Sequence, residues 1–340
     1  MPFQITIQPS GHIFTPEADE TILEAALRQG FTLPYGCRNG ACGSCKGKVV
    51  SGQVDYGDHQ PNTLTDEEKA QGLALFCCAT PLSELVIECR EIGVDKDIQI
   101  KTIPCRVQKL EKISNDVALL SLKLPASERM QFMAGQYIDI LLKDGKRRSF
   151  SLANAPHDDE TLQLHIRHVA GGTFSEYVFS QMQEKAILRF EGPLGTFFLR
   201  EDSEKPIIFL ATGTGFAPIK SIVEHALHSG TKRSLTLYWG ARHLPDMYMF
   251  DLPMQWQQAY PNFKFVPVLS QPSPDDQWTG RVGHVQDCVL QDHPSILELQ
   301  VYACGSPIMV EDAHKKLVAA GLPNDDFFSD AFTFARDSKK

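Results

Sequence analysis

The spacing of hydrophobic residues changes twice along the chain, so three segments with different folds are predicted. In the first segment, residues 1–93, apolar and polar residues alternate at the N-terminus, which predicts a strand. Apolar residues at helical spacing over residues 21–30 predict one helix that ends at a glycine. A closing strand is predicted at residues 85–89, and a polar stretch at residues 93–97 predicts a linker.

The second and third segments differ in how their apolar runs are built. Between residues 98 and 200, short alternating runs separated by turns predict an antiparallel barrel. These runs lie at residues 104–107, 117–122, 137–142 and 162–167. Between residues 206 and 335, continuous apolar runs separated by helical stretches predict a parallel α/β sheet covered by helices. Those runs lie at residues 207–211, 235–239, 263–268 and 300–304. The chain is therefore expected to be multidomain.

Composition limits where the protein works and what it binds. The 340 residues carry a net charge of -9, and the first 93 residues hold 12 Asp or Glu against 6 Lys or Arg. This balance disfavours nucleic acid as a partner, and it would either steer a positively charged protein partner or simply keep the segment in solution. Nine cysteines, an odd number, argue against a secreted disulfide framework. Because neither a secretory leader nor a membrane-length apolar run is recognisable, a cytoplasmic protein without membrane association is expected.

Four cysteines have the spacing of one kind of iron-sulfur centre. Cys37, Cys42 and Cys45 form a C-x4-C-x2-C run with a distant fourth cysteine, which is the plant-type spacing for a 2Fe-2S cluster. Small residues in this loop allow backbone N–H groups to point at the sulfur atoms. Cys77 is predicted as the fourth ligand rather than Cys78, because it directly ends an apolar run. A zinc site and a disulfide pair are the alternatives. Four other cysteines are expected to be small buried residues: Cys78, Cys89, Cys105 and Cys288.

Two segments of the predicted barrel resemble the flavin signatures of the ferredoxin-NADP reductase superfamily. The first, R-x-aromatic-S, is matched by Arg148, Ser149, Phe150 and Ser151, and the second, G-G-x-x-S, is matched by residues 171–175. The resemblance implies that FAD binds here, with Arg148 at the pyrophosphate, Phe150 against the isoalloxazine ring and Ser151 near N5. The alternative is that Arg148 forms a surface ion pair and Phe150 is a core aromatic residue.

The same resemblance implies further flavin contacts on both sides of a turn. Three residues would line the flavin and its phosphate through backbone and side chains: His165, Ile166 and Arg167. Three more would present backbone N–H groups to the pyrophosphate at the start of a helix: Gly172, Thr173 and Ser175.

A glycine-rich turn follows the first strand of the predicted parallel sheet. Between this strand and a helix lie Thr212, Gly213, Thr214 and Gly215, in the order that cradles phosphate in nucleotide sites. Another strand ends at Cys304, Gly305, Ser306 and Pro307. The superfamily resemblance implies that Cys304 lies beside nicotinamide C4, and a buried core residue is the alternative.

Near the end of the chain, residues 327–332 resemble the superfamily's closing segment, in which an aromatic ring covers the flavin. Phe332 is predicted to be that ring, with Phe328, Phe334 or a plain core role as alternatives. Ser151, Cys304 and Phe332 are accordingly the predicted catalytic residues.

The nicotinamide dinucleotide is predicted to be NADH. Enzymes that use NADPH often present a Ser-Arg pair to the 2'-phosphate, whereas Gln271 follows Ser270 here. Asp246 is predicted to accept hydrogen bonds from the ribose hydroxyls instead. Arg242 lies nearby in the sequence and leaves NADPH possible.

Over its whole length the chain resembles the CDP-6-deoxy-3,4-glucoseen reductase family, within the NADH-dependent reductase components of bacterial oxygenases. The resemblance rests on residues 42–46, 76–78, 134–139, 195–198, 213–218, 301–306 and 328–332. It implies a plant-type ferredoxin domain of the β-grasp fold at residues 1–93, a FAD barrel at 98–200 and an NAD domain at 206–335. Electrons would pass from NADH to FAD, then to the cluster and then to a protein acceptor, for which a CDP-6-deoxyhexulose dehydrase is favoured.

Two other functions fit the same segments. The chain could be the reductase component of a mono- or dioxygenase, because the matching motifs bind cofactors and not partners. From another functional class, it could be an iron-sulfur redox sensor or carrier that no longer turns over NADH. The sequence assigns neither a docking surface nor an oligomeric state.

Overall fold

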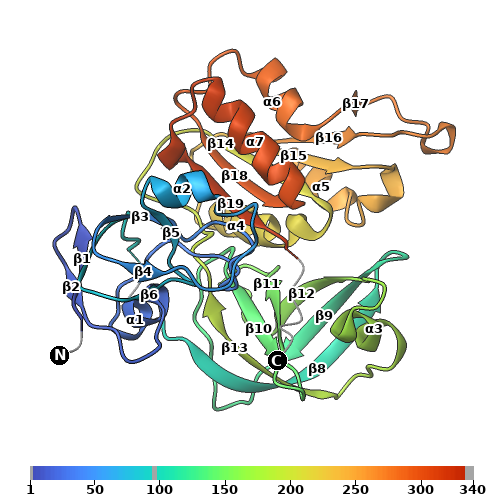
Figure 1. The fold of residues 1–340 in the computed structure, drawn as a ribbon. Helices are drawn as coiled ribbons and strands as arrows, with labels where there is room; N and C mark the ends of the chain where they lie inside the picture. The colour runs from blue at the N-terminus through green and yellow to red at the C-terminus, as the bar shows by residue number, and fades with distance from the viewer. Residues whose placement is uncertain (1–2, 94–97, 334–340) are drawn as a thin grey trace. The chain divides into compact units, whose positions relative to one another are not determined.

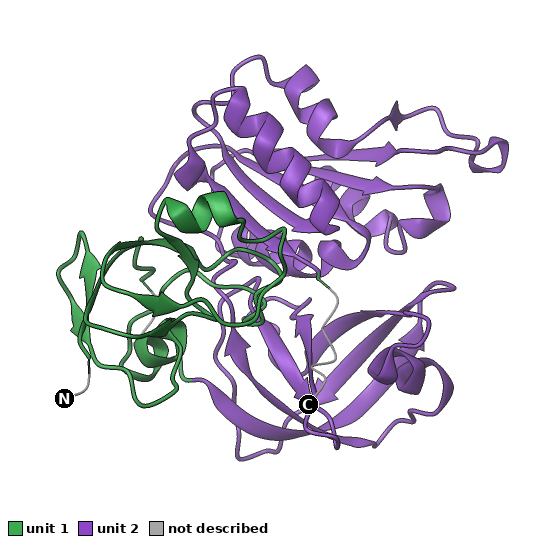
Figure 2. Cartoon of the chain, in the orientation of Figure 1, with its two compact units in different colours: residues 1–99, 333–340 green, residues 100–332 purple. Residues whose placement is uncertain are grey.

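The computed structural model describes residues 3–93 and 98–333 of the chain. Most of the predicted linker and the last two residues of the predicted third domain, one of which is Phe334, lie outside the described part. The chain forms two compact units, whose bodies are residues 1–99 and residues 100–332 (Figure 2).

The first unit is a small mixed sheet with two short helices, as expected for a β-grasp fold (Figure 1). Its five-stranded sheet has the order β2-β1-β7-β3-β5, in which β1 and β7 are parallel, and β4 and β6 form a separate pair. The strands are β1 (Ile5–Gln8), β2 (Ile13–Phe14), β3 (Lys46–Ser51), β4 (Val54–Asp55), β5 (Leu73–Leu75), β6 (Thr80–Pro81) and β7 (Leu85–Glu88). The helices are α1 (Ile22–Arg28) and α2 (Asp66–Ala70).

Helix α1 lies where the sequence predicts it, because both ends carry the expected signals. The Thr21 hydroxyl accepts from the Glu24 N–H at 3.2 Å, and the Glu24 carboxylate accepts from the Thr21 N–H at 3.0 Å. Gly30, with φ of +83°, turns the chain back after the helix. Ile22 and Leu23 are buried in the core of the unit, so the helix is fixed directly before the loop that carries the predicted ligand cysteines.

The second unit begins with a six-stranded antiparallel barrel. Its strand order is β11-β10-β13-β8-β9-β12, and a bridge between Leu152 and Leu164 joins the two ends of this order. The strands are β8 (Lys101–Lys112), β9 (Val117–Lys123), β10 (Tyr137–Leu141), β11 (Arg147–Ser151), β12 (Leu162–Arg167) and β13 (Ile187–Leu194), and α3 (Thr173–Ser180) follows β12. Each run predicted from alternation lies in or overlaps one of these strands, which confirms the barrel.

The rest of the second unit is a parallel sheet with helices on both faces (Figure 1). The strand order is β17-β16-β15-β14-β18-β19. The strands are β14 (Ile207–Thr212), β15 (Leu235–Ala241), β16 (Phe263–Leu269), β17 (Arg281–Val282), β18 (Gln300–Gly305) and β19 (Phe327–Ala331). The helices are α4 (Phe216–His228) and α5 (Asp251–Ala259), which share a core with one face, and α6 (Val285–Asp292) and α7 (Pro307–Ala319), which share a core with the other. Short 3-10 turns lie at Gly213–Gly215, Leu244–Asp246, Pro274–Asp276 and Asn324–Asp326. Burial on both faces explains why these strands are continuous apolar runs.

The barrel and the parallel sheet share one hydrophobic core. Ala134, Phe197 and Leu199 of the barrel are buried in the same cluster as Phe209 of β14 and Ile222 of α4. Strand ends of the barrel and of the parallel sheet can therefore contribute to a single site within this unit.

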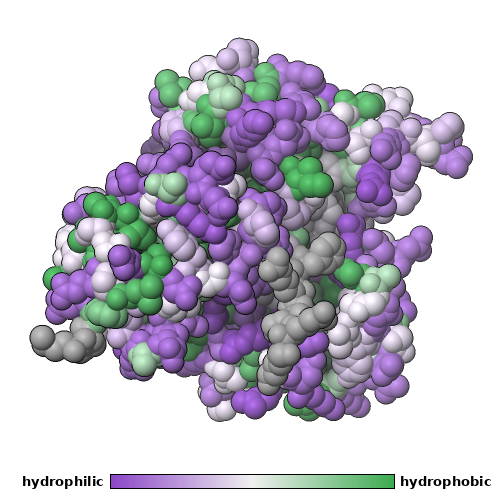
Figure 3. Space-filling view, in the orientation of Figure 1, coloured by the Kyte–Doolittle hydropathy of each residue, from purple (hydrophilic) through white to green (hydrophobic). Residues whose placement is uncertain are grey.

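The surface is mixed in character. Figure 3 shows polar residues over much of the visible face and hydrophobic residues gathered over the first unit. The exposed large apolar residues of that unit include Phe3, Ile13, Val50 and Leu82. Within residues 3–93 and 98–333, no helix combines the length and the apolar character needed to cross a membrane.

Candidate functional site

The loop between α1 and β3 gathers three of the predicted ligand cysteines. Backbone N–H groups of Ala41 and Cys42 donate to the Cys37 sulfur at 3.4 and 3.3 Å, and the Cys37 N–H donates to the Cys42 sulfur at 3.3 Å. The Cys42 thiol also hydrogen-bonds to Cys37, which lowers the pKa of Cys37 to about 7 and raises that of Cys42. The loop thus aims N–H dipoles at sulfur, as a bound anionic cluster requires.

The fourth predicted ligand, Cys77, lies just beyond β5 and pairs with Cys45. The Phe76 N–H donates to the Cys45 carbonyl at 3.1 Å, which brings the two chain segments together. The two thiols hydrogen-bond to each other, so the pKa of Cys77 falls to about 3 while burial and the same bond raise that of Cys45. Cys77 also interacts electrostatically with Cys37, and Cys45 with Cys42. Each of the four thiols interacts with two of the others, and two of the four are easily ionised, which fits the four thiolates that a 2Fe-2S cluster needs.

The remaining cysteines divide into two groups. Cys105 and Cys288 are buried, as the sequence predicts, but Cys78 and Cys89 are partly exposed. The prediction is wrong for these two because each lies at the end of a short strand or turn of the small first unit, where one side faces solvent. All nine cysteines are free thiols, which disagrees with the disulfide alternative.

Strand β11 carries the first flavin segment. Ser149 donates to Asp139 at 2.6 Å, and the Phe150 ring lies 5.3 Å from the Phe174 ring in a tilted pair. Arg148, the second residue of the strand, is partly exposed. Ser151, at the end of the strand, is buried, and its hydroxyl donates to Asp330 at 3.5 Å.

The three predicted flavin contacts on strand β12 differ from one another in burial and in their partners. Ile166 is fully buried in the barrel core, so only its backbone is left to line a flavin. His165 is also buried, and its Nδ1 lies 2.9 Å from the Tyr248 hydroxyl while Nε2 has no partner. Burial lowers the pKa of His165 to about 3, so the ring is neutral. Arg167 pairs with Asp116 at 3.0 Å.

The start of α3 carries the second flavin segment. The Ser175 hydroxyl donates to the carbonyls of Val169 and Gly172 at 3.1 and 3.2 Å and accepts from the Val169 N–H at 3.1 Å. This side chain therefore shapes the turn, and Thr173 is exposed at the first helical position. The N–H groups of the first turn remain available to a phosphate, as at any helix start.

The glycine-rich turn at residues 212–215, which is the predicted nucleotide loop, has close contacts that favour glycine. Gly213, with φ of +54°, lies so near Arg167 that a Cβ would be 2.7 Å from its guanidinium. A Cβ on Gly215 would lie 2.3 Å from the Cys304 carbonyl oxygen, and one on Gly305 would lie 2.4 Å from the Thr212 carbonyl oxygen. Strand β12, which carries Arg167, the glycine-rich turn and the end of β18 thus meet at one place. On β18, Gly305 is followed by Ser306, whose N–H donates to the Thr212 hydroxyl at 2.9 Å, and Pro307 begins α7. Thr214 lies within the same turn.

Asp330 lies beside the predicted site residues Ser151 and Cys304, and sequence reasoning missed it. It pairs in register with Cys304 across β18 and β19, and its carboxylate accepts from Ser151. Cys304 is fully buried, and burial together with Asp330 raises the pKa of its thiol. The available signal was its position in the closing segment between Phe328 and Phe332.

The two described aromatic residues of that segment have different surroundings. Phe328 stacks on Tyr302 at 4.7 Å and has the Arg200 guanidinium 4.9 Å from its ring centre, so it belongs to the core. Phe332 is partly buried, and its N–H donates to the Gly305 carbonyl at 2.8 Å. Phe332 is therefore next to the nucleotide strand ends, while Phe334 lies outside the described residues.

Asp246 lies at the edge of the parallel sheet, where its carboxylate caps a 3-10 turn. It accepts from the His243 N–H at 3.1 Å. A second carboxylate, Asp276, accepts from the N–H groups of Ser273 and Leu244 at 2.7 and 2.9 Å, and these bonds lower its pKa to about 2. Asp276 was not predicted from the sequence.

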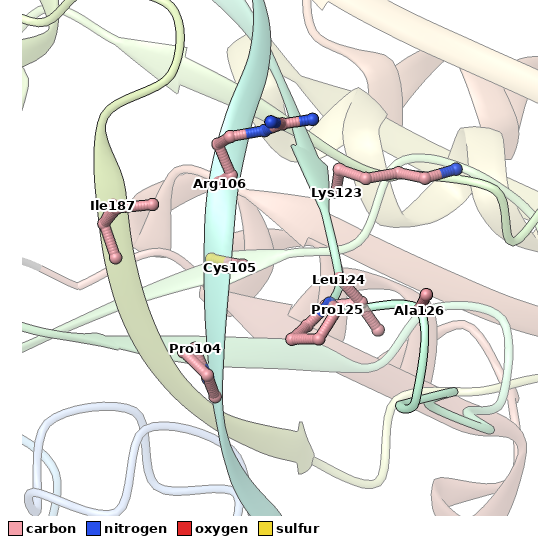
Figure 4. A pocket seen from close by; sticks show the side chains of 8 residues that line it. All are labelled: Pro104, Cys105, Arg106, Lys123, Leu124, Pro125, Ala126 and Ile187. Atoms are coloured by element: carbon pink, nitrogen blue, oxygen red, sulfur yellow. The ribbon is translucent and has the colours of Figure 1, made fainter.

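A cavity of about 420 Å³ lies on the barrel, away from these segments (Figure 4). It is lined by Pro104, Cys105, Arg106, Lys123, Leu124, Pro125, Ala126 and Ile187. None of these residues belongs to the predicted flavin or nucleotide segments.

Comparisons with known proteins agree with this division. Family models match a 2Fe-2S iron-sulfur cluster binding domain at residues 5–82, an oxidoreductase FAD-binding domain at residues 104–199 and an oxidoreductase NAD-binding domain at residues 209–315. The CDP-6-deoxy-L-threo-D-glycero-4-hexulose-3-dehydrase reductase of Yersinia pestis is 42% identical over 332 residues, which cover 98% of this chain and 99% of that protein. The chain belongs to the iron-sulfur flavoprotein reductases.

Other proteins similar to this reductase are named as a phenol hydroxylase protein and a cytochrome P450 reductase. The phenol hydroxylase P5 protein of Acinetobacter pittii is 36% identical, over 99% of this chain and 96% of its own. The crystal structure of the Amycolatopsis cytochrome P450 reductase GcoB matches with a TM-score of 0.80 and 33% identity, covering 98% of this chain and 99% of that one. The protein is therefore an NAD(P)H-dependent oxidoreductase with 2Fe-2S, FAD and NAD domains that supplies electrons to a redox acceptor protein.

Proposed function

We propose that this reductase takes electrons from NADH and delivers them singly to a protein acceptor of the CDP-6-deoxyhexulose dehydrase type. Bound FAD supplies the conversion of a hydride into single electrons, and the 2Fe-2S cluster is the exit to the acceptor. Arg148, Phe150 and the start of α3 would hold the flavin, and Cys37, Cys42, Cys45 and Cys77 would hold the cluster.

The observation that carries this proposal is the meeting of Ser151, Asp330 and Cys304. Ser151 ends a flavin strand, Cys304 ends a nucleotide strand, and Asp330 is opposite Cys304 and within 3.5 Å of the Ser151 hydroxyl. Ser151 belongs to the barrel and Asp330 to the parallel sheet. Their hydrogen bond therefore joins the part of the unit predicted to bind FAD to the part predicted to bind NADH. Such an arrangement is expected where a nicotinamide ring meets a flavin.

The chain's own residues define the chemistry of this place. Ser151 and Cys304 are both buried, so they would exclude water from the place where NADH meets FAD. The raised pKa of Cys304 keeps its thiol neutral, so it adds no negative charge beside a hydride donor. Asp330 orients the Ser151 hydroxyl by accepting its proton in a hydrogen bond.

NADH is favoured over NADPH by the charges at the sheet edge. Asp246 and Asp276 lie on the turns that follow β15 and β16, and the low pKa of Asp276 keeps it negative. Gln271 offers no positive charge to a 2'-phosphate, and leaving such a phosphate unpaired near carboxylates is costly.

The dehydrase-type acceptor is favoured because the Yersinia pestis reductase matches at 42% identity, against 36% for the phenol hydroxylase protein. An oxygenase component is the alternative acceptor. Purified proteins of both kinds can be compared directly with this reductase.

The test measures flavin reduction and acceptor reduction separately. Rapid mixing with NADH should bleach the flavin, and kcat/KM for NADH with a dye acceptor should exceed that for NADPH by about tenfold or more, or about 1.4 kcal/mol. Cys42→Ser should spare flavin bleaching but abolish reduction of the dehydrase. Preference for NADPH contradicts the nucleotide assignment, and faster reduction of an oxygenase component assigns the chain to the alternative. A flavin that NADH does not bleach would make the protein a redox sensor or carrier.

A further inference from the structure

Two side chains of α4 reach from the parallel sheet to the barrel (Figure 1 shows the helix on the barrel side of the sheet). Lys220 is 6% exposed, and its Nζ donates to the Ala153 carbonyl oxygen at 3.0 Å. Ser221 is 0% exposed, and its hydroxyl donates to the Asn154 carbonyl oxygen at 2.7 Å. Both acceptors belong to the chain that directly follows Ser151. Helix α4 is therefore hydrogen-bonded to the segment that follows Ser151, the serine predicted to lie near the flavin.

That segment is fixed on its other side by β12. The Ala153 N–H donates to the Gln163 carbonyl at 2.8 Å, and the Asn154 side-chain oxygen accepts from the Gln163 N–H at 2.8 Å. The Asn154 amide donates to the Asp158 carbonyl at 2.7 Å. With β12 on one side and α4 on the other, the backbone after Ser151 has little room to move.

The beginning of α4 carries the nucleotide loop. Gly213–Gly215 ends where Phe216 starts the helix, and Lys220 and Ser221 lie on the second turn of the helix. At about 1.5 Å per residue, these two side chains are about 6 to 8 Å along the axis from the helix start. Because a helix moves as a rigid element over so short a distance, the bonds to Ala153 and Asn154 locate the nucleotide loop relative to Ser151.

The charge of Lys220 is not explained by packing. Its ammonium is buried, and it forms an ion pair with Glu224 at 2.8 Å on the next turn. Burial raises the pKa of Glu224, against the effect of Lys220. An apolar side chain would fill this place without the desolvation cost of a buried ion pair. The ammonium is explained by the barrel carbonyl that it binds.

We propose that Lys220 and Ser221 are positioning residues for hydride transfer, which hold the nucleotide loop at a fixed distance from Ser151. This inference rests on the proposed function of that site. Hydride transfer needs the reacting atoms about 3 to 3.5 Å apart. Loss of either hydrogen bond would let the nucleotide loop move relative to Ser151, which lowers the transfer rate far more than the affinity for FAD or NADH.

The experiment compares variants in the full chain loaded with FAD and cluster. Ser221→Ala removes one donor, Lys220→Met removes donor and charge, and Lys220→Gln keeps a donor without the charge. Ser121→Ala is the matched control, because Ser121 is also a buried serine but lies on β9. Four quantities are measured: FAD content, the thermal midpoint, the long-wavelength charge-transfer absorbance formed on mixing with NADH, and the rates of flavin reduction by NADH and by 4-deuterated NADH.

We expect Ser221→Ala to keep its FAD and its NADH dissociation constant within about twofold, while flavin reduction slows roughly fivefold, as for one lost hydrogen bond. The charge-transfer absorbance should weaken, and the isotope effect should become more temperature dependent. Lys220→Gln should retain more of the charge-transfer absorbance and more of the flavin-reduction rate than Lys220→Met.

The proposal is overturned if Ser221→Ala and Lys220→Gln keep the wild-type charge-transfer absorbance and reduction rate. It is also overturned if their losses only follow the thermal midpoint, as in Ser121→Ala. Should Lys220→Met fail to fold, the other two variants decide. A wild-type flavin that NADH does not bleach overturns the proposed function itself, whatever the variants show.

Discussion

At the scale of single residues, the cluster site depends on which of two adjacent thiols is a ligand. Cys77 hydrogen-bonds to Cys45, and Cys78, which lies against Gly40, hydrogen-bonds to Cys77 with 3.6 Å between the two sulfur atoms. We predict that Cys77→Ser removes or strongly alters the visible and paramagnetic spectra of the cluster while FAD stays bound, and that Cys78→Ser leaves both spectra unchanged. The reverse result would show that Cys78 is the ligand.

A second residue-scale prediction concerns the bond between Ser151 and Asp330. Ser151→Ala removes the hydroxyl, and Asp330→Asn removes the negative charge that orients it. Each should slow flavin reduction by NADH about fivefold or more, since one hydrogen bond is worth roughly 1 kcal/mol, while FAD content is unchanged. Single-turnover kinetics measure this rate. Ser180→Ala on α3 is the control, and equal slowing in all three variants would remove the special role of this pair.

The buried neutral histidine gives a prediction about acid stability. Burial lowers the pKa of His165 to about 3, whereas an unfolded histidine has a pKa of about 6.5. Between these values the unfolded chain binds the extra proton, so stability is full above about pH 6.5 and falls by about 1.4 kcal/mol per pH unit on acidification. Urea unfolding of His165→Gln should show a correspondingly shallower loss between about pH 6 and 4.5. Parallel curves for variant and wild type would contradict the assignment.

How much of the site could be predicted from the sequence differs from residue to residue. Cysteine spacing and the glycine turn are local patterns, so the cluster loop and the nucleotide loop were predictable. The roles that we propose for Asp330 and Lys220 depend on hydrogen-bond partners far away in the chain: Ser151 is 179 residues from Asp330, and Ala153 is 67 residues from Lys220. No local pattern marks such a residue, because the same carboxylate or ammonium elsewhere would lie in solvent.

At the scale of elements, the nucleotide loop is expected to tolerate no side chain at Gly215. A Cβ there would lie 2.3 Å from the Cys304 carbonyl oxygen and 2.6 Å from the Gly305 Cα, so β18 and the loop must separate. We predict that Gly215→Ala loses NADH-dependent flavin reduction by more than about tenfold, whereas dithionite still reduces the flavin. Gly93→Ala, with nothing within 4 Å of the added methyl group, is the control. An active Gly215→Ala protein would contradict the tight packing.

Elements were predictable where they are long and strongly patterned. Strands β12, β14 and β16 lie where their apolar runs predict, because burial on one or both faces leaves a clear period. The pair formed by strands β4 and β6 was not predicted, because two-residue strands such as Val54–Asp55 are too short to show an alternation of apolar and polar residues.

At the scale of the whole molecule, the acidic first unit allows a test of electrostatic steering. Its 12 acidic against 6 basic residues up to position 93 should speed encounter with a positively charged acceptor. Raising the ionic strength from about 10 mM to about 150 mM shortens the Debye length from about 30 Å to about 8 Å. We therefore predict that kcat/KM for cytochrome c falls with salt, whereas the rate with a neutral dye does not. Salt-independent rates would mean that the acidity serves only solubility.

The complete burial of Cys304 makes this thiol a reporter of how often the proposed hydride-transfer site opens. Alkylating reagents attack only exposed thiolates, and Cys304 is 0% exposed with a raised pKa. Its labelling rate therefore measures the small population of molecules in which β18 and the neighbouring strand ends have come apart. The rate at which Cys304 is labelled would therefore report the opening of the strand ends around the residue that we propose lies beside the nicotinamide ring.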